Sequence, residues 1–408
     1  MNERVVITGI GMVTALGKTR EATWERMLAG ECGIRPTELF DTEGYRSRLS
    51  AEVRVSELND GLTPLERRRW SRSDQMGLAA ATEALADAGL LDGALDRRRV
   101  GVVLGAGTAD LLRNETFYKK WMTSGIDRAR KSDVWNHFSS TPGDVIAHRF
   151  GFEGLRSCVV AACSSSTIAI GQAADAIRRG RADAVLAGGT DALSRLTFSG
   201  FNSLRLMDPS PCRPFDRSRA GMSIGEGAAI LVLEPLDRAR RRGARIYGEL
   251  AGYSFVCEAF HPTAPEPEGR PVASVIAGAL RRGEVDPHEV DHINAHGTAT
   301  PQNDAAESKG FRRVFGDRTS EIPVTSIKSM IGHCLGAAGA IEAAALAMSI
   351  ARGVIPPTIN HEEGDCDVMV VANHAREQRL RSGVSTSLGF GGNDAALVIR
   401  AWDSANAN

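Results

Sequence analysis

Cys163 is the residue of this sequence best suited to act as a nucleophile. It lies in the stretch 157–171, SCVVAACSSSTIAIG, where a short apolar strand is followed by a tight elbow and a helical run over 168–179. A cysteine at such an elbow lies beside unpaired N–H groups of the helix, whose dipole stabilises a thiolate. The same donors face the place where a thioester oxygen would become negative. The alternative is a small buried cysteine in a packed turn, so the interpretation depends on whether a base lies elsewhere in the chain.

Two histidines in the second half are the candidate partners of this cysteine. His296 lies in NAHGTAT, after an expected strand over 290–294, and His333 ends KSMIGH, before an Ala- and Gly-rich helix. The carboxyl ends of strands are where open α/β sheets place their sites. Either histidine alone would more often be structural, but Cys–His pairing is a recognised nucleophile arrangement. We therefore expect the three side chains to share one site.

The composition of the chain argues against several other classes of protein. The 408 residues are 42% hydrophobic and 24% charged, with a formal net charge of −1, which is ordinary for a globular protein. A charge near zero argues against a nucleic-acid coat, although it leaves room for a local basic patch facing an acidic partner. The seven cysteines are scattered and form no CxxC, which argues against a zinc site or disulfide framework and favours the reducing cytoplasm. We expect no signal peptide and no transmembrane helix, since no apolar run reaches about 18 residues.

The order of expected elements predicts a layered α/β architecture. In the first half, strands are expected over 5–8, 100–104, 157–161, 184–187 and 228–233, and helices over 21–29, 74–88 and 164–179. The alternation of strands and helices begins again after a boundary near Gly243, which divides the chain into two halves, 1–243 and 244–408. In the second half, strands are expected over 245–255, 290–294, 323–326, 368–371, 383–388 and 395–400, and helices over 271–282, 304–313 and 335–351. This alternation favours largely parallel sheets. The helix over 335–351 is small and apolar all round, so we expect it between two sheets.

The whole chain resembles the β-ketoacyl-acyl-carrier-protein synthases, in particular the elongating Cys-His-His type of the thiolase-like superfamily. The motifs that carry the resemblance are VVITGIGMVTALG at the start, AACSSS at Cys163, RPFD at 213–216, GEGAAILVLE at 225–234, NAHGTATPQND at 294–304, SIKSMIGHCLGAAGAIE at 326–342, PPTIN at 356–360 and GFGG at 389–392. Together these motifs are specific, whereas GFGG or CSSS alone would not be. The resemblance implies a thiolase-like α/β fold, with two similar halves in a layered αβαβα arrangement of five-stranded mixed sheets.

The resemblance also implies an activity, the decarboxylative Claisen condensation of fatty-acid chain elongation. Cys163 would hold an acyl chain as a thioester, and malonyl-acyl-carrier protein would supply the attacking carbon. His296 and His333, as neutral imidazoles, would donate hydrogen bonds to the malonyl thioester oxygen as it becomes an enolate. The backbone N–H groups of Cys163 and Phe390 would form the oxyanion hole. The phosphopantetheine arm belongs to the carrier protein, so no metal and no organic cofactor of the chain itself are expected.

Further residues take supporting roles by resemblance. Lys328 would pair with Glu307 and keep the histidine region ordered, although an ordinary structural ion pair would also fit the sequence. Gly389 and Gly391 flank Phe390, so we expect a gating loop there, the plainer alternative being an aromatic plug. The substrate-binding candidates are Thr298, Thr300, Thr108, Phe198, Phe201 and Ala162. Two of them, Thr298 and Thr300, would bond the phosphopantetheine arm but would equally suit the cap of a turn.

The expected partner is an acyl carrier protein, which is acidic. The candidate docking residues are Arg67, Arg68, Arg69, Arg128, Arg130, Lys131 and Arg205, although basic runs are more often solvated surface. The least periodic segment, 110–140, is expected to be an insertion that acts as a lid or a dimer contact. The resemblance favours a homodimer, with a heterodimer containing a sister subunit as the alternative. We expect no nucleic-acid or membrane partner.

Several residues depart from the family pattern and leave the acyl substrate open. Leu388 stands where the family usually has Phe, and Asn393-Asp394 follow GFGG where Thr-Asn is usual, so Asp394 would alter the hydrogen bonding beneath the gate. Phe198 and Thr108 differ in size from the residues expected around the acyl pocket. The alternative to fatty-acid elongation is therefore a specialised polyketide, polyene or unusual-lipid pathway.

Three further classes of protein fit the sequence less well than the condensing enzyme. A non-catalytic chain-length partner subunit would lack the nucleophile, which Cys163 argues against. A thiolase would need a second cysteine near the C-terminus, where this chain has GFGG. An initiating synthase would carry asparagine in place of one histidine, and this chain has His333.

Overall fold

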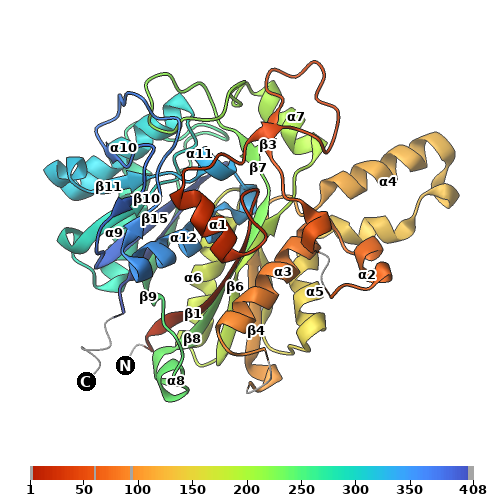
Figure 1. Cartoon of the computed structure of the whole chain (residues 1–408), viewed down its shortest axis with the longest axis horizontal. Helices are drawn as coiled ribbons and strands as arrows, with labels where there is room; N and C mark the ends of the chain where they lie inside the picture. Colours follow the sequence, from red (N-terminus) through yellow and green to blue (C-terminus); the bar gives the residue numbers. More distant parts are fainter. Residues whose placement is uncertain (1–2, 59–60, 92–94, 403–408) are drawn as a thin grey trace.

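The computed structural model describes residues 3–58, 61–91 and 95–402 (Figure 1). Within that part of the chain, eleven strands form one mixed sheet, in the order β13-β11-β10-β15-β16-β9-β1-β8-β6-β4-β5. The first half contributes β1 (Val5–Val13), β4 (Val100–Gly105), β5 (Arg156–Val159), β6 (Ala184–Asp191) and β8 (Gly227–Pro235). The second half contributes β9 (Gly248–Cys257), β10 (Val290–Asn294), β11 (Pro323–Thr325), β13 (Met369–Val370), β15 (Ser382–Gly389) and β16 (Asn393–Arg400). The predicted mixed α/β fold is confirmed.

The two halves of the sheet meet between β1 and β9. Only two residue pairs join these antiparallel strands, Val6 with Glu249 and Ile7 with Gly248. On the first-half side, β4 pairs in parallel with β5 and β6, while β8 runs antiparallel to both β6 and β1. The first half therefore has the five strands expected, and the second half has the six expected along the chain, one more than the five-stranded sheet that the resemblance implies. Short strands form two small sheets, one of β2 (Arg35–Pro36), β3 (Leu49–Ala51) and β7 (Ile224–Gly225), the other of β12 (Val354–Ile355) and β14 (Arg376–Glu377).

Helices cover both faces of the sheet and fill the space between its halves. The first-half helices are α1 (Arg20–Leu28), α2 (Pro64–Arg69), α3 (Arg72–Asp87), α4 (Leu111–Ser124), α5 (Thr141–Phe150), α6 (Ser165–Arg178), α7 (Arg195–Ser203) and α8 (Leu236–Arg241). The second-half helices are α9 (Arg270–Gly283), α10 (Pro301–Phe315), α11 (Lys328–Ile331) and α12 (Ala338–Arg352). In Figure 1, α3 and α5 cover the first half, and α9 and α10 lie on the opposite side of the molecule. Between them lie α6 and α12, which pack against each other.

The Ala-rich helix α12 is the shared core of the two halves. It packs against β8 of the first half and β15 of the second, and every residue from 338 to 350 is buried. This confirms the prediction of a helix between two sheets. The stretch Leu335–Arg352 is long and apolar enough to cross a membrane, with a mean hydropathy of 1.3, which was not expected from the sequence. However, 89% of it is buried inside the protein, so its composition is explained by packing between the two halves.

The segment predicted to be an irregular insertion contains a regular helix. The 14-residue helix α4 begins after Asp110, whose side chain accepts a hydrogen bond from Arg113 N, and ends at Gly125, where φ is +88°. Only Asn114 and Phe117 of this helix are buried, whereas Tyr118, Trp121 and Met122, which recur at helical spacing, are exposed. The sequence features that indicate this helix are its N-cap, Asp110, and the glycine at its end, Gly125. Figure 1 shows α4 extending away from the body of the molecule.

Replacing Gly105 by alanine is expected to loosen the contact between β4 and the amino end of α6. An added Cβ would lie 2.2 Å from the backbone nitrogen of Ser166, and backbone cannot move aside as a flexible side chain does. We expect Gly105→Ala to lower the free energy of unfolding by about 1–3 kcal/mol in urea denaturation. The matched control is Gly200→Ala in α7, where nothing lies within 4 Å of the added Cβ. Equal effects of the two substitutions would contradict this account of the packing.

Candidate active site

The elbow after β5 fixes the position of Cys163. The preceding residue, Ala162, has φ of +49°, a left-handed conformation that is strained for alanine. Side-chain hydrogen bonds hold it: Ser164 Oγ donates to Ala161 O at 2.8 Å, and Ser165 Oγ donates to Ala162 O at 2.6 Å. The serines after the cysteine therefore fasten the turn that presents it. Ala162 belongs to this turn and does not line the cavity at the site, so its prediction as a substrate contact stays a prediction.

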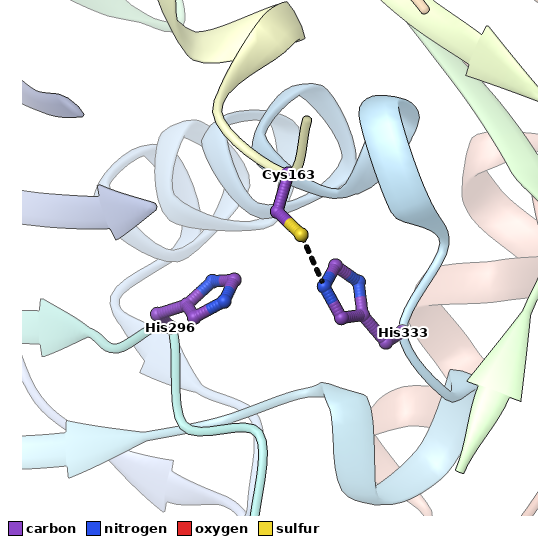
Figure 2. A group of neighbouring side chains, drawn as sticks. All are labelled: Cys163, His296 and His333. Carbon is purple, nitrogen blue, oxygen red and sulfur yellow. Dashed lines mark hydrogen bonds between the residues drawn. The ribbon is translucent and has the colours of Figure 1, made fainter. Parts of the chain in front are cut away.

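Cys163, His296 and His333 converge as predicted, although they come from distant parts of the chain (Figure 2). The Cys163 sulfur lies 3.0 Å from His333 Nε2. The two imidazole rings face each other edge to face, with centroids 5.2 Å apart. One ligand-type atom from each of the three residues lies within 4.8 Å of the others. A single thioester can therefore contact all three side chains.

Hydrogen bonds at the far side of each imidazole set its tautomer. Leu335 N donates to His333 Nδ1 at 3.2 Å, and Lys328 Nζ lies 3.3 Å from His296 Nδ1. Since Nδ1 accepts in both rings, the proton of each neutral imidazole resides on Nε2. Both rings therefore present N–H donors to the sulfur and the space beside it. A metal ion would need lone pairs there, so this tautomer disfavours metal ligation by the three residues.

Burial dominates the ionisation of these groups. It raises the pKa of the Cys163 thiol to about 11, although Lys328 and a hydrogen bond from the Phe390 N–H act in the opposite direction. Burial, followed by the charge of Lys328, holds the pKa values of His296 and His333 well below their usual range. The histidines are therefore neutral at pH 7, as predicted. The thiolate expected from the helix amino end is not the resting form, because desolvation outweighs the opposing effects of Lys328 and the Phe390 N–H.

The buried cation behind the histidines pairs with a different acid from the one predicted. Lys328 Nζ forms an ion pair with Glu342 of α12 and donates to His296 O at 2.6 Å. Glu307 instead accepts from the backbone N–H groups of His296, at 2.7 Å, and Gly297, at 2.8 Å. Glu307 thus holds the turn that carries His296, and the expected Lys328–Glu307 pair is wrong. The missed signal was Glu342, a single acidic residue in the otherwise apolar helix α12.

A cavity opens beside the three residues. Its other lining residues are Phe201, Leu206, Met222, Glu258, His261, Pro262, Thr263, Ala264, Pro265, Thr298, Thr300, Gln302, Asn303, Leu388, Gly389, Phe390, Gly392 and Asp394. Thr298 and Thr300 therefore lie at the cavity as predicted, with their hydroxyl oxygens 2.9 Å apart. The wall from 258 to 265 was not anticipated from the sequence, because its residues belong to an irregular loop.

Two predicted pocket residues lie outside this cavity. Thr108 is held by Asp191, whose carboxylate accepts from its backbone N–H at 3.0 Å. Phe198 has no exposed surface and packs edge to face on Phe40 and Tyr45, at centroid distances of 5.3 and 5.5 Å. Neither residue lines this cavity, and their assignment to the acyl pocket stays a prediction.

The GFGG turn places Phe390 over the site. The half-buried Phe390 ring lies against Phe201, with centroids 5.6 Å apart, and Gly391 and Gly392 have φ of +81° and +75°. Two successive residues in this region require glycine. The third glycine, Gly389, leaves no room for a Cβ, which would lie 2.9 Å from Asn393 O. Phe390 thus contributes both a ring at the cavity and the N–H that reaches the Cys163 sulfur.

The predicted docking arginines lie on the surface. Those described are Arg67, Arg68 and Arg69 on α2, Arg128 and Arg130 after α4, and Arg205 after α7, all exposed. The side chain of Lys131 lies outside the described part of the structure. Arg113 links α2 to α4 through its guanidinium, which donates to Arg68 O at 2.9 Å. The basic residues of α2 therefore share a surface with the helix that projects from the body.

The fold and the Cys–His–His site together define a ketosynthase, a condensing enzyme that transfers acyl groups. The sequence matches the family models for the N-terminal domain of β-ketoacyl synthase over residues 2–239 and for its C-terminal domain over 247–362. The chain belongs to the β-ketoacyl synthase family.

Relatives of this chain come from two kinds of pathway. It is 40% identical to the tetracenomycin polyketide synthase ketoacyl synthase alpha subunit of Streptomyces glaucescens, over 97% of both chains. It is 36% identical to 3-oxoacyl-[acyl-carrier-protein] synthase 2 of a Synechocystis strain, over 98% of both chains. Among solved structures, that of the ishigamide ketosynthase/chain length factor superposes with a TM-score of 0.94 at 35% identity, covering 99% of this chain and 100% of the other. A type II polyketide ketosynthase in complex with its acyl-carrier protein superposes with a TM-score of 0.91 at 33% identity, covering the same shares.

Removing the acid that pairs with Lys328 is expected to destabilise the protein strongly. Both side chains of the pair are 2% exposed, so Glu342→Gln leaves a buried ammonium without its counterion. We expect the free energy of unfolding in urea to fall by about 3–5 kcal/mol. The control is Glu363→Gln, which removes a pair whose side chains are 65% and 64% exposed and is expected to cost about 0–1 kcal/mol. A Glu342→Gln effect no larger than the control would contradict the role of this pair.

Proposed function

We propose that the protein condenses an acyl group held on Cys163 with malonyl-acyl-carrier protein, with loss of carbon dioxide, to give a β-ketoacyl-acyl-carrier protein. The observation that carries this proposal is the pair of imidazoles that present Nε2–H donors beside the sulfur. A site built only for thiol chemistry would need one base, whereas an enolate oxygen is best stabilised by two donors.

Acyl loading is a thioester exchange at Cys163. The sulfur attacks the carbonyl carbon of the acyl-carrier protein thioester, and the departing phosphopantetheine sulfur takes the proton that the thiol loses. The helix amino end and the Phe390 N–H favour the charge that develops during this exchange, since the neutral thiol is the resting form. The phosphopantetheine arm would pass along the cavity wall that contains Thr298 and Thr300.

Condensation follows from the geometry of the histidines. The bond to the malonyl carboxylate breaks, carbon dioxide leaves, and the electron pair forms an enolate whose oxygen accepts hydrogen bonds from His296 and His333. The enolate carbon then attacks the Cys163 thioester, whose carbonyl oxygen faces the N–H groups of Cys163 and Phe390. The carbon–sulfur bond breaks, and Cys163 leaves as a thiolate that recovers a proton from solvent. Donors fixed in advance favour the enolate over the ground state.

The nucleophile and the decarboxylation machinery should separate on mutation. Cys163→Ala is expected to abolish condensation but to retain release of carbon dioxide from malonyl-carrier protein, because both imidazole donors remain. His333→Ala is expected to lower that release by about 10²–10³-fold, the usual effect of one lost oxyanion donor. The measurement is trapping of labelled carbon dioxide with each purified variant.

Two outcomes would contradict these assignments. Full decarboxylation by His333→Ala would remove His333 from its proposed role. The second outcome is that wild-type protein does not condense and that iodoacetamide does not label Cys163 stoichiometrically. It would favour the alternative of a non-catalytic chain-length subunit.

For the acyl substrate, we infer a growing chain of a specialised polyketide or polyene pathway. The 40% identity to the tetracenomycin subunit and the fit to the ishigamide ketosynthase support this inference. Fatty-acid elongation is the second candidate, favoured by the 36% identity to the Synechocystis enzyme. The partners would be a carrier protein, docked on the basic surface near α2, and a sister subunit of the chain-length type, with a homodimer as the alternative. The compartment would be the cytoplasm.

The acyl specificity can be tested directly on Cys163. Wild-type protein is incubated with a panel of saturated, polyene and β-keto acyl groups on carrier proteins, and the peptide that contains Cys163 is examined by mass spectrometry. We expect unsaturated or β-keto groups to accumulate on Cys163 faster than saturated groups of equal length. If the saturated chains load onto Cys163 fastest, the result would instead support fatty-acid elongation. Cys163→Ala is the control for labelling at other cysteines.

A further inference from the structure

Two carboxyl groups lie against each other in the cavity wall beside the gate. Asp394, the second residue of β16, is 1% exposed, and Glu258 directly follows β9. Both line the cavity that contains Cys163. The Asp394 carboxyl lies within hydrogen-bonding reach of the Glu258 carboxyl, and no N–H or O–H of the described residues donates to Asp394 Oδ2. Two adjacent ionised carboxylates would repel each other, which favours a proton on Asp394 that can form a hydrogen bond to Glu258.

The carboxyl pair lies where two segments of the cavity wall are joined. One is the gate loop, residues 389–392, and the other is the wall segment, residues 258–266. Glu258 N donates to Gly392 O, and Gly391 N donates to Pro262 O, both at 2.8 Å. The segments approach so closely that a Cβ on Gly392 would lie 2.9 Å from Glu258 Cβ. The side-chain pair therefore reinforces two backbone hydrogen bonds at this junction.

The surroundings of the pair supply further negative charge. Burial first, and then the charge of Glu258, raises the pKa of Asp394 to about 9, and Glu307 of α10 and Cys257 of β9 act in the same direction. His261 of the wall segment lines the same cavity. Of the arginines on α9, which packs on β16, Arg270 and Arg282 pair with Glu266 and Asp175, while Arg281 is exposed. Loss of the shared proton would leave two adjacent carboxylates in mutual repulsion.

We propose that one proton shared by Asp394 and Glu258 fastens the gate loop to the wall segment, and that loss of this proton frees the loop and opens access to Cys163. The two carboxyl groups are positioning residues, because they act on the loop that carries Phe390 and touch none of the reacting atoms. An asparagine at 394 would keep a hydrogen bond to Glu258 but could not titrate. The proton dependence is therefore a property of the aspartate in this chain. The inference extends beyond the proposed function, since it needs no acyl substrate.

The test compares the pH dependence of Cys163 alkylation in wild type and Asp394→Asn. Iodoacetamide is added to the intact folded protein between pH 8 and 10, and modification of the Cys163 peptide is followed by mass spectrometry. In Asp394→Asn, the rate should rise about tenfold per pH unit, as expected for a thiol of pKa about 11. In wild type, the rise should be steeper below pH 9, approaching about a hundredfold per unit because loop opening adds a second ionisation, and should fall back to about tenfold per unit above pH 9.

Hydrogen exchange identifies the loop that moves. At pH 10 and relative to Asp394→Asn, the wild-type amides of Gly391 and Glu258 should exchange faster, since each donates across the junction. Melting curves at each pH verify that both proteins remain folded, and Glu258→Gln replaces Asp394→Asn if that variant does not fold. Equal slopes of alkylation for wild type and variant, or a wild-type slope below that of the variant, would overturn the proposal. Equal protection of the two amides would also overturn it.

Discussion

The site depends on the ion pair and hydrogen bonds of one buried ammonium group, that of Lys328. Lys328 contacts the carboxylate of Glu342 in α12, the backbone oxygen of His296 and the ring nitrogen of the same histidine. It thereby fixes the tautomer of His296, and its charge contributes to keeping both histidines neutral. Because Glu342 lies on the helix shared by both halves, the ion pair also connects the histidine turn to the centre of the fold. The chemistry of the site and the packing of the molecule thus rest on the same side chains.

The sulfur and the imidazoles form a site whose resting state is neutral. A thiolate–imidazolium pair would be the simplest way to activate a cysteine, but complete burial makes that charge separation costly. The site instead offers donors to charge that appears only during the reaction. This arrangement protects the sulfur from unwanted reactions and suits a thioester intermediate that must await a second substrate.

The parts of the structure that sequence predicted best are those with strong local signals. The strands and the apolar helix α12 were predicted from hydrophobic periodicity and composition. The three reactive residues were predicted from the motifs that contain them. The partner of Lys328 was mispredicted because Glu307, three residues after the motif at 294–304, and Glu342, the last residue of the motif at 326–342, are both acids, and only packing decides between them. Helix α4 was missed because its short apolar stripe of Phe117, Tyr118, Trp121 and Met122 runs directly into the irregular residues 125–140, which hide its periodicity in the segment as a whole. Phe198 and Thr108 were assigned to the acyl pocket from their size, and neither lines the cavity beside Cys163, because sequence gives a side chain's size but not the direction in which it points.

The position of α12 also constrains how the chain can be made. This helix belongs to the last quarter of the sequence, yet it packs against β8 of the first half. During translation, the first half therefore presents an uncovered apolar face until residue 352 has left the ribosome. A nascent chain in that state is prone to aggregate and is a natural client for chaperones that shield apolar surface. Successful production of the enzyme in a foreign host would thus depend on how long this face stays open, and hence on the rate of elongation through the second half.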